Sequence, residues 1–293
     1  MQAWPDGRDA GTESTVQMGK HSGADSILEG LRVEPGTPAD LRKRNPASRL
    51  GLGEKADGQA RSAELAAELD GLHDRLWAEG RRSVLLVLQG LDASGKDGTI
   101  RRVLTGLNPQ GCSVVNFKAP TTVDLAHDYL WRIHAATPAR GILGVWNRSH
   151  YEDVVTARII GVIDDRQARR RTRHIRGFER MLHDDGFTIV KVFLHVSKDE
   201  QRARLRARID DPEKNWKFRR SDLDTRAQWD EYQERYEAAI TATSTSWAPW
   251  YVVPADHKWV RDVAVASLLV DVLTRLDPRI PDPEPGLEGL VVE

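Results

Sequence analysis

The sequence has little of what secreted and membrane proteins depend on. Among its 293 residues there is one cysteine, Cys112, so an internal disulfide or a cysteine metal cluster cannot form, and a reducing compartment is expected. The longest apolar run, Val84 to Leu88, is far shorter than the roughly 20 residues of a membrane span. The opening residues, Met1 to Asp6, lack a charged segment followed by an apolar one, which argues against a secretory signal. A cytoplasmic protein is therefore expected.

An excess of charge of one sign is also missing. The chain carries 43 basic and 44 acidic side chains, for a formal net charge of −1, whereas a general nucleic-acid binder needs a basic surface for phosphate contacts. Arginines nevertheless concentrate between Arg166 and Arg180, and again between Arg202 and Arg208. These stretches could hold a polyanionic ligand, or they could be solvated helix faces.

Composition divides the chain into a domain and two tails. Residues 1–25 are polar and show no apolar period, which is typical of a flexible tail, and residues 277–293 are interrupted by prolines. Residues 26–276 are expected to form one domain. Five apolar runs predict buried strands, and helix-forming segments lie between them. The predicted strands are Val84–Leu88, Ser113–Phe117, Ile142–Trp146, Thr188–Val196 and Trp250–Val253, and the predicted helices are Ala63–Trp77, Asp124–His134, Arg170–His183, Asp222–Ile240 and Trp259–Leu276.

This alternation predicts an α/β fold with a parallel, five-stranded sheet between two layers of helices. The segment GLDASGKDGT, Gly90 to Thr99, follows the first strand and begins a helix. It has the spacing of a Walker A phosphate loop at Gly90, Gly95 and Lys96. The glycines allow backbone N–H groups to point inward, and Lys96 supplies an ammonium group for phosphate oxygens.

Two residues of this loop depart from the usual pattern. Asp97 stands where Ser or Thr normally offers a hydroxyl to magnesium, and Thr99 comes two positions later. Asp92 places a carboxylate where phosphates must approach, which is unfavourable unless a cation lies between them. Asp92 is thus a candidate Mg²⁺ ligand, the alternative being a turn residue that bonds its own backbone.

A second motif, NRSHYED from Asn147 to Asp153, follows the third strand. Asn147 occupies the position of a Walker B aspartate but brings no charge, so Asp92, Glu152 or both must supply the metal's carboxylates. Arg148 can bridge phosphates. His150 is a candidate base, but a phosphate nucleophile is already ionised, and a structural role is favoured.

With these motifs placed, residues Leu31 to Leu276 resemble the polyphosphate kinase 2 family, which has a P-loop kinase fold and a helical lid. The resemblance rests on both motifs and on three further segments: FKAPTTVDLAHDYLWRIH (Phe117–His134), DPEKNWKFRRSDLD (Asp211–Asp224) and APWYVVPADHKW (Ala248–Trp259). It implies a lid at about residues 200–224. Asn147, Arg148 and Glu152 are most similar to the subgroup that uses both AMP and ADP.

Together, the motifs and the resemblance define four sets of candidate site residues. Catalytic roles are expected for Asp92, Lys96 and Arg148, with Asp92 and Glu152 as Mg²⁺ ligands. Phosphate binding is expected for Gly90, Ala93, Ser94, Gly95, Lys96, Asp97, Gly98, Thr99, Arg204, Arg208 and Lys217. Nucleotide binding is expected for Lys118, Asn147, Arg148 and Glu152.

The resemblance implies a reversible, Mg²⁺-dependent transfer of the terminal phosphoryl group of inorganic polyphosphate to AMP or ADP, by an enzyme that is a homo-oligomer. Adenine or guanine as the base is left open. Three alternatives are an ATP-dependent P-loop kinase, an inactive polyphosphate-binding module and a nucleotide switch. The last is disfavoured because the chain has no Asn-Lys-x-Asp motif for reading guanine.

Overall fold

A six-stranded sheet forms the centre of the computed structural model, which describes residues 27, 28, 30–287 and 290–292. The strand order is β1-β6-β5-β2-β4-β3. The predicted N-terminal tail, residues 1–25, lies outside the described residues. The strands are β1 (Arg32–Val33), β2 (Ser83–Gln89), β3 (Cys112–Asn116), β4 (Leu143–Asn147), β5 (Phe187–His195) and β6 (Trp250–Pro254).

Five of these strands are those predicted, within one residue at either end, and they run parallel. The expectation of a five-stranded, wholly parallel sheet is corrected by β1, which pairs antiparallel with β6 through Arg32↔Tyr251 and Val33↔Trp250. Two residues are too few to show the alternation that marks a strand. In β2, every residue is buried, as expected for a strand covered on both faces.

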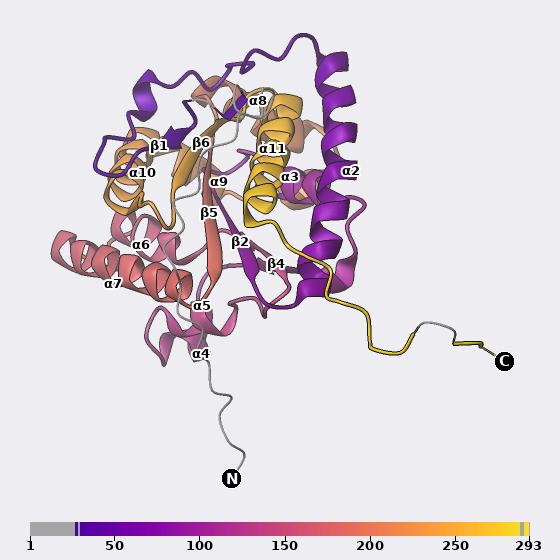
Figure 1. Cartoon of the computed structure of the whole chain (residues 1–293). Coiled ribbons are helices and arrows are strands. Elements are labelled where there is room, and N and C mark those ends of the chain that lie inside the picture. Colours follow the sequence, from indigo (N-terminus) through magenta and orange to yellow (C-terminus); the bar gives the residue numbers. More distant parts are fainter. Residues whose placement is uncertain (1–26, 29, 288–289, 293) are drawn as a thin grey trace.

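Helices cover both faces of the sheet, which confirms the predicted three-layer α/β/α sandwich (Figure 1). α2, α3 and α11 lie on one face, and α6, α7 and α10 on the other. The helices are α2 (Lys55–Glu79), α3 (Lys96–Val103), α4 (Thr122–Leu125), α5 (Trp131–Ala135), α6 (Thr156–Ile159), α7 (Asp165–Asp184), α8 (Lys198–Asp210), α9 (Ser221–Ala227), α10 (Trp229–Thr243) and α11 (Lys258–Leu276). Short 3₁₀ helices are η1 (Leu41–Lys43), η2 (Pro109–Gly111), η3 (His150–Asp153) and η4 (Asn215–Lys217).

Two predicted helices are each broken in two, and this is a correction. The segment Asp124–His134 forms α4 and α5 because Asp128 bonds locally: its carboxylate accepts from Leu130 N at 2.9 Å, which competes with helical bonding. The segment Asp222–Ile240 divides at Gln228, where the backbone leaves helical geometry between α9 and α10. The division separates the mostly exposed α9 from α10, which buries an aromatic face.

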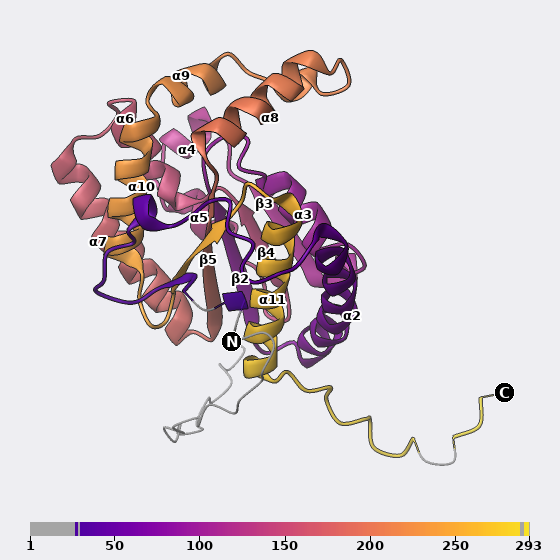
Figure 2. The ribbon, with the colours of Figure 1, turned by 90° about the horizontal axis from the view of Figure 1, so that it is seen from above.

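The segment expected to be the lid forms α8, η4 and α9. Figure 2 shows α8 and the turn that follows it extending beyond the sheet and its covering helices. At the other end of the domain, the described residues that follow α11 contain neither helix nor strand. Within the part of the chain that the structure describes, no helix is both long and apolar enough to cross a membrane.

Candidate active site

The phosphate loop connects β2 to α3 at the carboxyl edge of the sheet, where parallel α/β folds bind ligands. Its backbone turns sharply: φ is 147° at Gly90, 62° at Ala93 and 110° at Gly95. At Gly90, a Cβ atom would lie 2.9 Å from the carbonyl oxygen of Leu194 on β5. Glycine is therefore required there both by the dihedral angle and by the close approach of the neighbouring strand.

The side chain of Lys96 folds back over this loop. Its Nζ donates to the carbonyl oxygens of Gly90 at 2.5 Å and Leu91 at 3.3 Å. Burial, and secondly the positive charge of Arg148, lower the pKa of Lys96 from 10.5 to about 8. The ammonium group thus lies at the centre of the loop and is incompletely neutralised by its protein partners, an arrangement suited to anionic phosphate.

A buried arginine packs against the phosphate loop. Arg261, in the first turn of α11, pairs with Asp262 at 2.6 Å and lies 3.5 Å from the carbonyl oxygen of Ser94. A Cβ atom on Gly95 would come within 1.8 Å of Arg261 Nη1. A side chain at position 95 would therefore have to displace the buried guanidinium that pairs with Asp262, in addition to adopting a positive φ.

We expect Gly95→Ala to reduce kcat/KM for phosphoryl transfer by about 100-fold, because displacing a reacting group by about 1 Å has an effect of that size. Gly177→Ala is a matched control: in α7, a Cβ atom at Gly177 would meet nothing within 4 Å. The control should leave kinetics unchanged and raise the unfolding free energy by about 1 kcal/mol. Steady-state kinetics and thermal unfolding measure both. Normal turnover by Gly95→Ala would show that the loop does not require this packing.

The three predicted catalytic residues meet at the mouth of the loop. Arg148 Nη2 donates to Asp92 Oδ1 at 2.6 Å, and Arg148 Nη1 lies 3.4 Å from Glu152 Oε2. Burial lowers the pKa of Arg148, but the carboxylates of Glu152 and Asp92 more than offset it, so its pKa is raised. Arg148 adopts φ of 64°, an uncommon conformation for a non-glycine residue, which directs it toward the loop.

Asn147 occupies the end of β4 and reaches the first turn of α3. Its amide nitrogen donates to Asp97 Oδ1 at 2.7 Å. The two departures from the usual motifs therefore face one another: where a P-loop enzyme has a hydroxyl and a carboxylate, this chain pairs a carboxylate with an amide. Asn147 thus keeps a polar link between β4 and α3.

The remaining predicted loop residues divide by burial. Ser94 and Thr99 are buried, whereas Asp97 and Gly98 are exposed at the start of α3. Lys118 is exposed just beyond β3, and its carbonyl oxygen accepts from Arg132 at 2.9 Å. The nucleotide-binding role of Lys118 stays a prediction.

The lid arginines differ in their surroundings. Arg204 donates to four carbonyl oxygens, of Ala93, Ser94, Ala255 and Asp256, at 2.5–3.0 Å. Arg208 is more open: it lies 3.5 Å from Asp222 Oδ2 and 3.4 Å from the carbonyl oxygen of Lys217. Arg204 therefore stabilises the phosphate loop in this structure, whereas Arg208 has N–H groups that can donate to a ligand.

Lys217 is exposed, with its ammonium group 5.0 Å from the ring centroid of Trp216. Such a cation on a flexible stem is free to reach an anion. Its phosphate-binding role, like those of Arg204 and Arg208, stays a prediction.

His150 belongs to a buried polar cluster beneath the Asn147–Asp153 motif. Glu179 lies 3.2 Å from His150 Nε2, accepts from Tyr151 Oη at 2.8 Å, and pairs with Lys191 Nζ at 2.6 Å. All four side chains are almost fully buried. A buried charge paired in this way holds elements together, which agrees with the structural role predicted for His150.

Sequence reasoning missed three residues that contribute to this region: Arg261, Gln201 and Asp222. Asp222, on α9, is buried, and burial and the negative charge of Asp92 raise its pKa. It is therefore a third carboxylate facing the site. Its position in the lid segment was visible in the sequence, but an acid among arginines gave no sign that it would turn inward.

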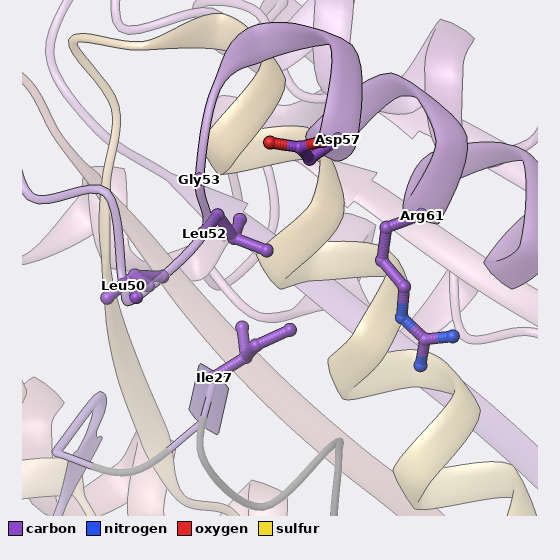
Figure 3. Close-up of a pocket in the computed structure, with 7 residues that line it drawn as sticks. Ile27, Leu50, Leu52, Gly53, Asp57 and Arg61 are labelled. Carbon is purple, nitrogen blue, oxygen red and sulfur yellow. The ribbon is translucent and has the colours of Figure 1, made fainter.

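A hollow elsewhere in the molecule is separate from these residues. It has a volume of about 490 Å³ and is lined by residues from the segment before α2 and from the first turns of α2 (Figure 3). The lining residues are Ile27, Leu50, Gly51, Leu52, Gly53, Asp57 and Arg61. None of them is a predicted site residue. The candidate active site is therefore assigned to the phosphate loop and the lid, and not to this hollow.

A parallel α/β sandwich with a lysine-bearing phosphate loop at its carboxyl edge and an arginine-rich helical segment above it defines a P-loop kinase. The model of the family Polyphosphate kinase 2 (PPK2) matches residues 53–280, and the chain belongs to this family.

Similar proteins agree with this assignment. The AMP/ADP-polyphosphate phosphotransferase of Meiothermus ruber is 49% identical over 268 residues, which cover 91% of this chain and 100% of the relative. The ADP-polyphosphate phosphotransferase of Rhodopseudomonas palustris is 45% identical over 230 residues, covering 74% and 80%. The crystal structure of Polyphosphate Kinase 2 from Arthrobacter aurescens TC1 superposes with a TM-score of 0.85 at 45% identity and covers 89% of this chain and 93% of that one.

Proposed function

We propose that this protein transfers the terminal phosphoryl group of inorganic polyphosphate to AMP and ADP, reversibly and with Mg²⁺. The observation that carries the proposal is the meeting of Lys96, Asp92 and Arg148 at one edge of the sheet. The names of the relatives support it, since the Meiothermus ruber protein is an AMP/ADP enzyme and the Rhodopseudomonas palustris protein an ADP enzyme.

The side chains of the site can perform an in-line transfer without a covalent intermediate. A phosphate oxygen of the acceptor attacks the terminal phosphorus of polyphosphate, and the bond to the next bridging oxygen breaks. Lys96, Arg148 and the loop amides stabilise the charge spread over the transferring group. A phosphate nucleophile is already ionised, so no general base is required, and His150 remains structural.

The carboxylates present fit a magnesium ion held largely by the substrate. In the described part of the chain, no group of three or more His, Cys, Asp or Glu side chains is close enough to enclose a metal. Mg²⁺ is commonly bound through one or two carboxylates together with substrate phosphates and water, and Asp92 and Glu152 can supply the carboxylates. When bound, Mg²⁺ neutralises negative charge on the phosphates.

The lid supplies the second requirement of the reaction, exclusion of water. Without it, water would compete with the nucleotide and polyphosphate would be hydrolysed. Arg208 and Lys217 project from this segment, and each can reach phosphates farther along a chain. A long polyanion therefore suits this arrangement better than a short donor does. The homo-oligomer and the cytoplasmic location stay predictions.

The donor assay tests the proposal against its closest rival, an ATP-dependent kinase. Purified protein with Mg²⁺ and ADP should form ATP when polyphosphate is present and none when it is omitted, and EDTA should abolish formation. Product is measured by anion-exchange chromatography. Phosphorylation of AMP or a small metabolite by ATP alone, without turnover of polyphosphate, would favour the rival. Binding of polyphosphate without turnover and without need of Mg²⁺ would identify an inactive binding module.

A further inference from the structure

The buried side-chain amide of one residue of α8 connects the lid helix α9 to the phosphate loop. Gln201, on α8, is fully buried. Its Nε2 donates to the backbone carbonyl oxygen of Asp92 at 3.0 Å, and its Oε1 accepts from Arg226 Nη1 on α9 at 3.1 Å. Both ends of the amide are therefore used, one on the loop and one on the lid.

Different side chains join α8 to the phosphate loop and α9 to α8. Arg204 donates to the carbonyl oxygens of Ala93 and Ser94 in the loop and of Ala255 after β6. By contrast, α9 is joined to α8 by Arg226, which also donates to the Lys198 carbonyl oxygen at 2.6 Å, and by the 3.5 Å approach of Arg208 to Asp222. A displacement of α9 would thus change the surroundings of Gln201 before it changed those of Arg204.

The carbonyl that Gln201 contacts belongs to a residue with a direct role. The carboxylate of Asp92 pairs with Arg148 at 2.6 Å, and its backbone precedes Ala93, which has φ of 62°. A turn with an uncommon dihedral angle persists only where its surroundings hold it. The donor from Gln201 is one of these restraints, since it fixes the orientation of the peptide group between Asp92 and Ala93.

We propose that Gln201 is a positioning residue that couples the place of α9 to the orientation of Asp92. With α9 in place, Arg226 holds Gln201 Oε1, and the amide is oriented to donate to the loop. With α9 displaced, the amide is free to turn about its terminal torsion, which has a broad preference, and the Asp92 carbonyl loses its donor. The loop is then correctly shaped for transfer only when the lid is in place. This inference rests on the proposed function.

A double-mutant cycle tests the coupling. Gln201→Met keeps the volume and removes both polar groups, and Arg226→Gln removes the guanidinium. We expect each single variant to lower kcat about tenfold, with KM for ADP unchanged. A tenfold change is about 1.4 kcal/mol, which lies within the coupling energies of contacting residues in one network. The double variant should be no slower than Gln201→Met alone. Multiplying effects, about 100-fold in the double variant, would overturn the proposal.

Two further variants separate coupling from packing. Gln201→Glu can still accept from Arg226, but once ionised it cannot donate to Asp92, so it should behave like Gln201→Met as pH rises; a normal kcat that does not fall with rising pH would contradict the proposal. If Gln201→Met folds poorly, Gln201→Leu, which also removes both polar groups, completes the cycle with Arg226→Gln. Arg275→Gln, an exposed residue of α11 paired with Asp271, is the control and should leave kcat unchanged.

The same variants allow a second measurement, the release of orthophosphate. Orthophosphate released per ATP formed should rise in Gln201→Met and Arg226→Gln, because the loop and lid no longer act together to exclude water, and it should stay at the wild-type ratio in Arg275→Gln. Wild-type protein that forms no nucleotide product at all would refute the proposed function. Wild-type protein that transfers normally while the two substitutions act independently would refute only the coupling.

Discussion

Lys96→Ala is expected to lower kcat by about a thousand-fold, with the fold intact. The loss of one well-placed electrostatic group from a transition state has an effect of this size, about 4 kcal/mol. Lys96 Nζ lies within hydrogen-bond distance of two carbonyl oxygens of the phosphate loop, where transferring phosphate oxygens would approach. Steady-state kinetics with polyphosphate and ADP measure the effect, and circular dichroism checks the fold. Lys43→Ala, an exposed lysine paired with Asp40, is the control.

The ionisation of Lys96 provides an independent check. Since the pKa of the buried ammonium is lowered to about 8, the charged form is lost as pH rises through that value. The wild-type kcat/KM for polyphosphate should therefore fall above about pH 8, whereas kcat should fall only at higher pH because bound phosphate stabilises the ammonium. Lys96→Ala should lack this alkaline limb. A Lys96→Ala variant with near-normal turnover would contradict the assigned role.

Asp92→Ala is expected to have an effect of similar size, about a thousand-fold on kcat, together with a higher Mg²⁺ requirement. The geometry allows a competing explanation, because Asp92 pairs with Arg148 at 2.6 Å. If it served only to neutralise Arg148, its removal would free that cation for phosphate and activity would be kept or increased. If it holds Mg²⁺ beside the phosphates, its removal weakens metal binding and slows transfer.

A Mg²⁺ titration of activity distinguishes the two explanations. The metal role predicts that saturation of Asp92→Ala requires higher Mg²⁺ than wild type, whereas Asp74→Ala, an exposed carboxylate on α2, should match wild type. Unchanged kcat and an unchanged Mg²⁺ midpoint in Asp92→Ala would exclude the metal role. Activity that is kept or increased, with the wild-type Mg²⁺ midpoint, would instead point to charge balance alone.

The parallel strands were predictable because burial on both faces leaves short apolar runs that local turns interrupt. Val84–Leu88, for example, lies within the observed Ser83–Gln89. β1 was not predictable, since two residues carry no period and its pairing with β6 joins segments more than 200 residues apart. Local bonds accompany the break between α4 and α5, among them that of Asp128, and apolar periodicity does not reveal them.

The candidate site, like the fold, was predictable from the sequence only in part. The loop residues Gly90, Gly95 and Lys96 were recognisable because a phosphate cradle requires fixed residue types at fixed spacing within one short segment. The surroundings of Arg204 were not, because its acceptors include backbone carbonyls at Ala93 and Ala255, and any sequence offers such groups. Partners that are distant along the chain become visible only when the fold brings them together.

The most direct test of polyphosphate-dependent phosphoryl transfer at this site uses AMP as the acceptor. Purified protein with Mg²⁺, long-chain polyphosphate and AMP is followed over time by chromatography, beside a Lys96→Ala control. We expect ADP to appear first and ATP afterwards. Both products should depend on polyphosphate, and the control should form neither at a comparable rate. If folded wild-type protein forms no nucleotide from AMP or from ADP, or if Lys96→Ala does so as fast as wild type, the assignment of this site to polyphosphate-dependent transfer is wrong.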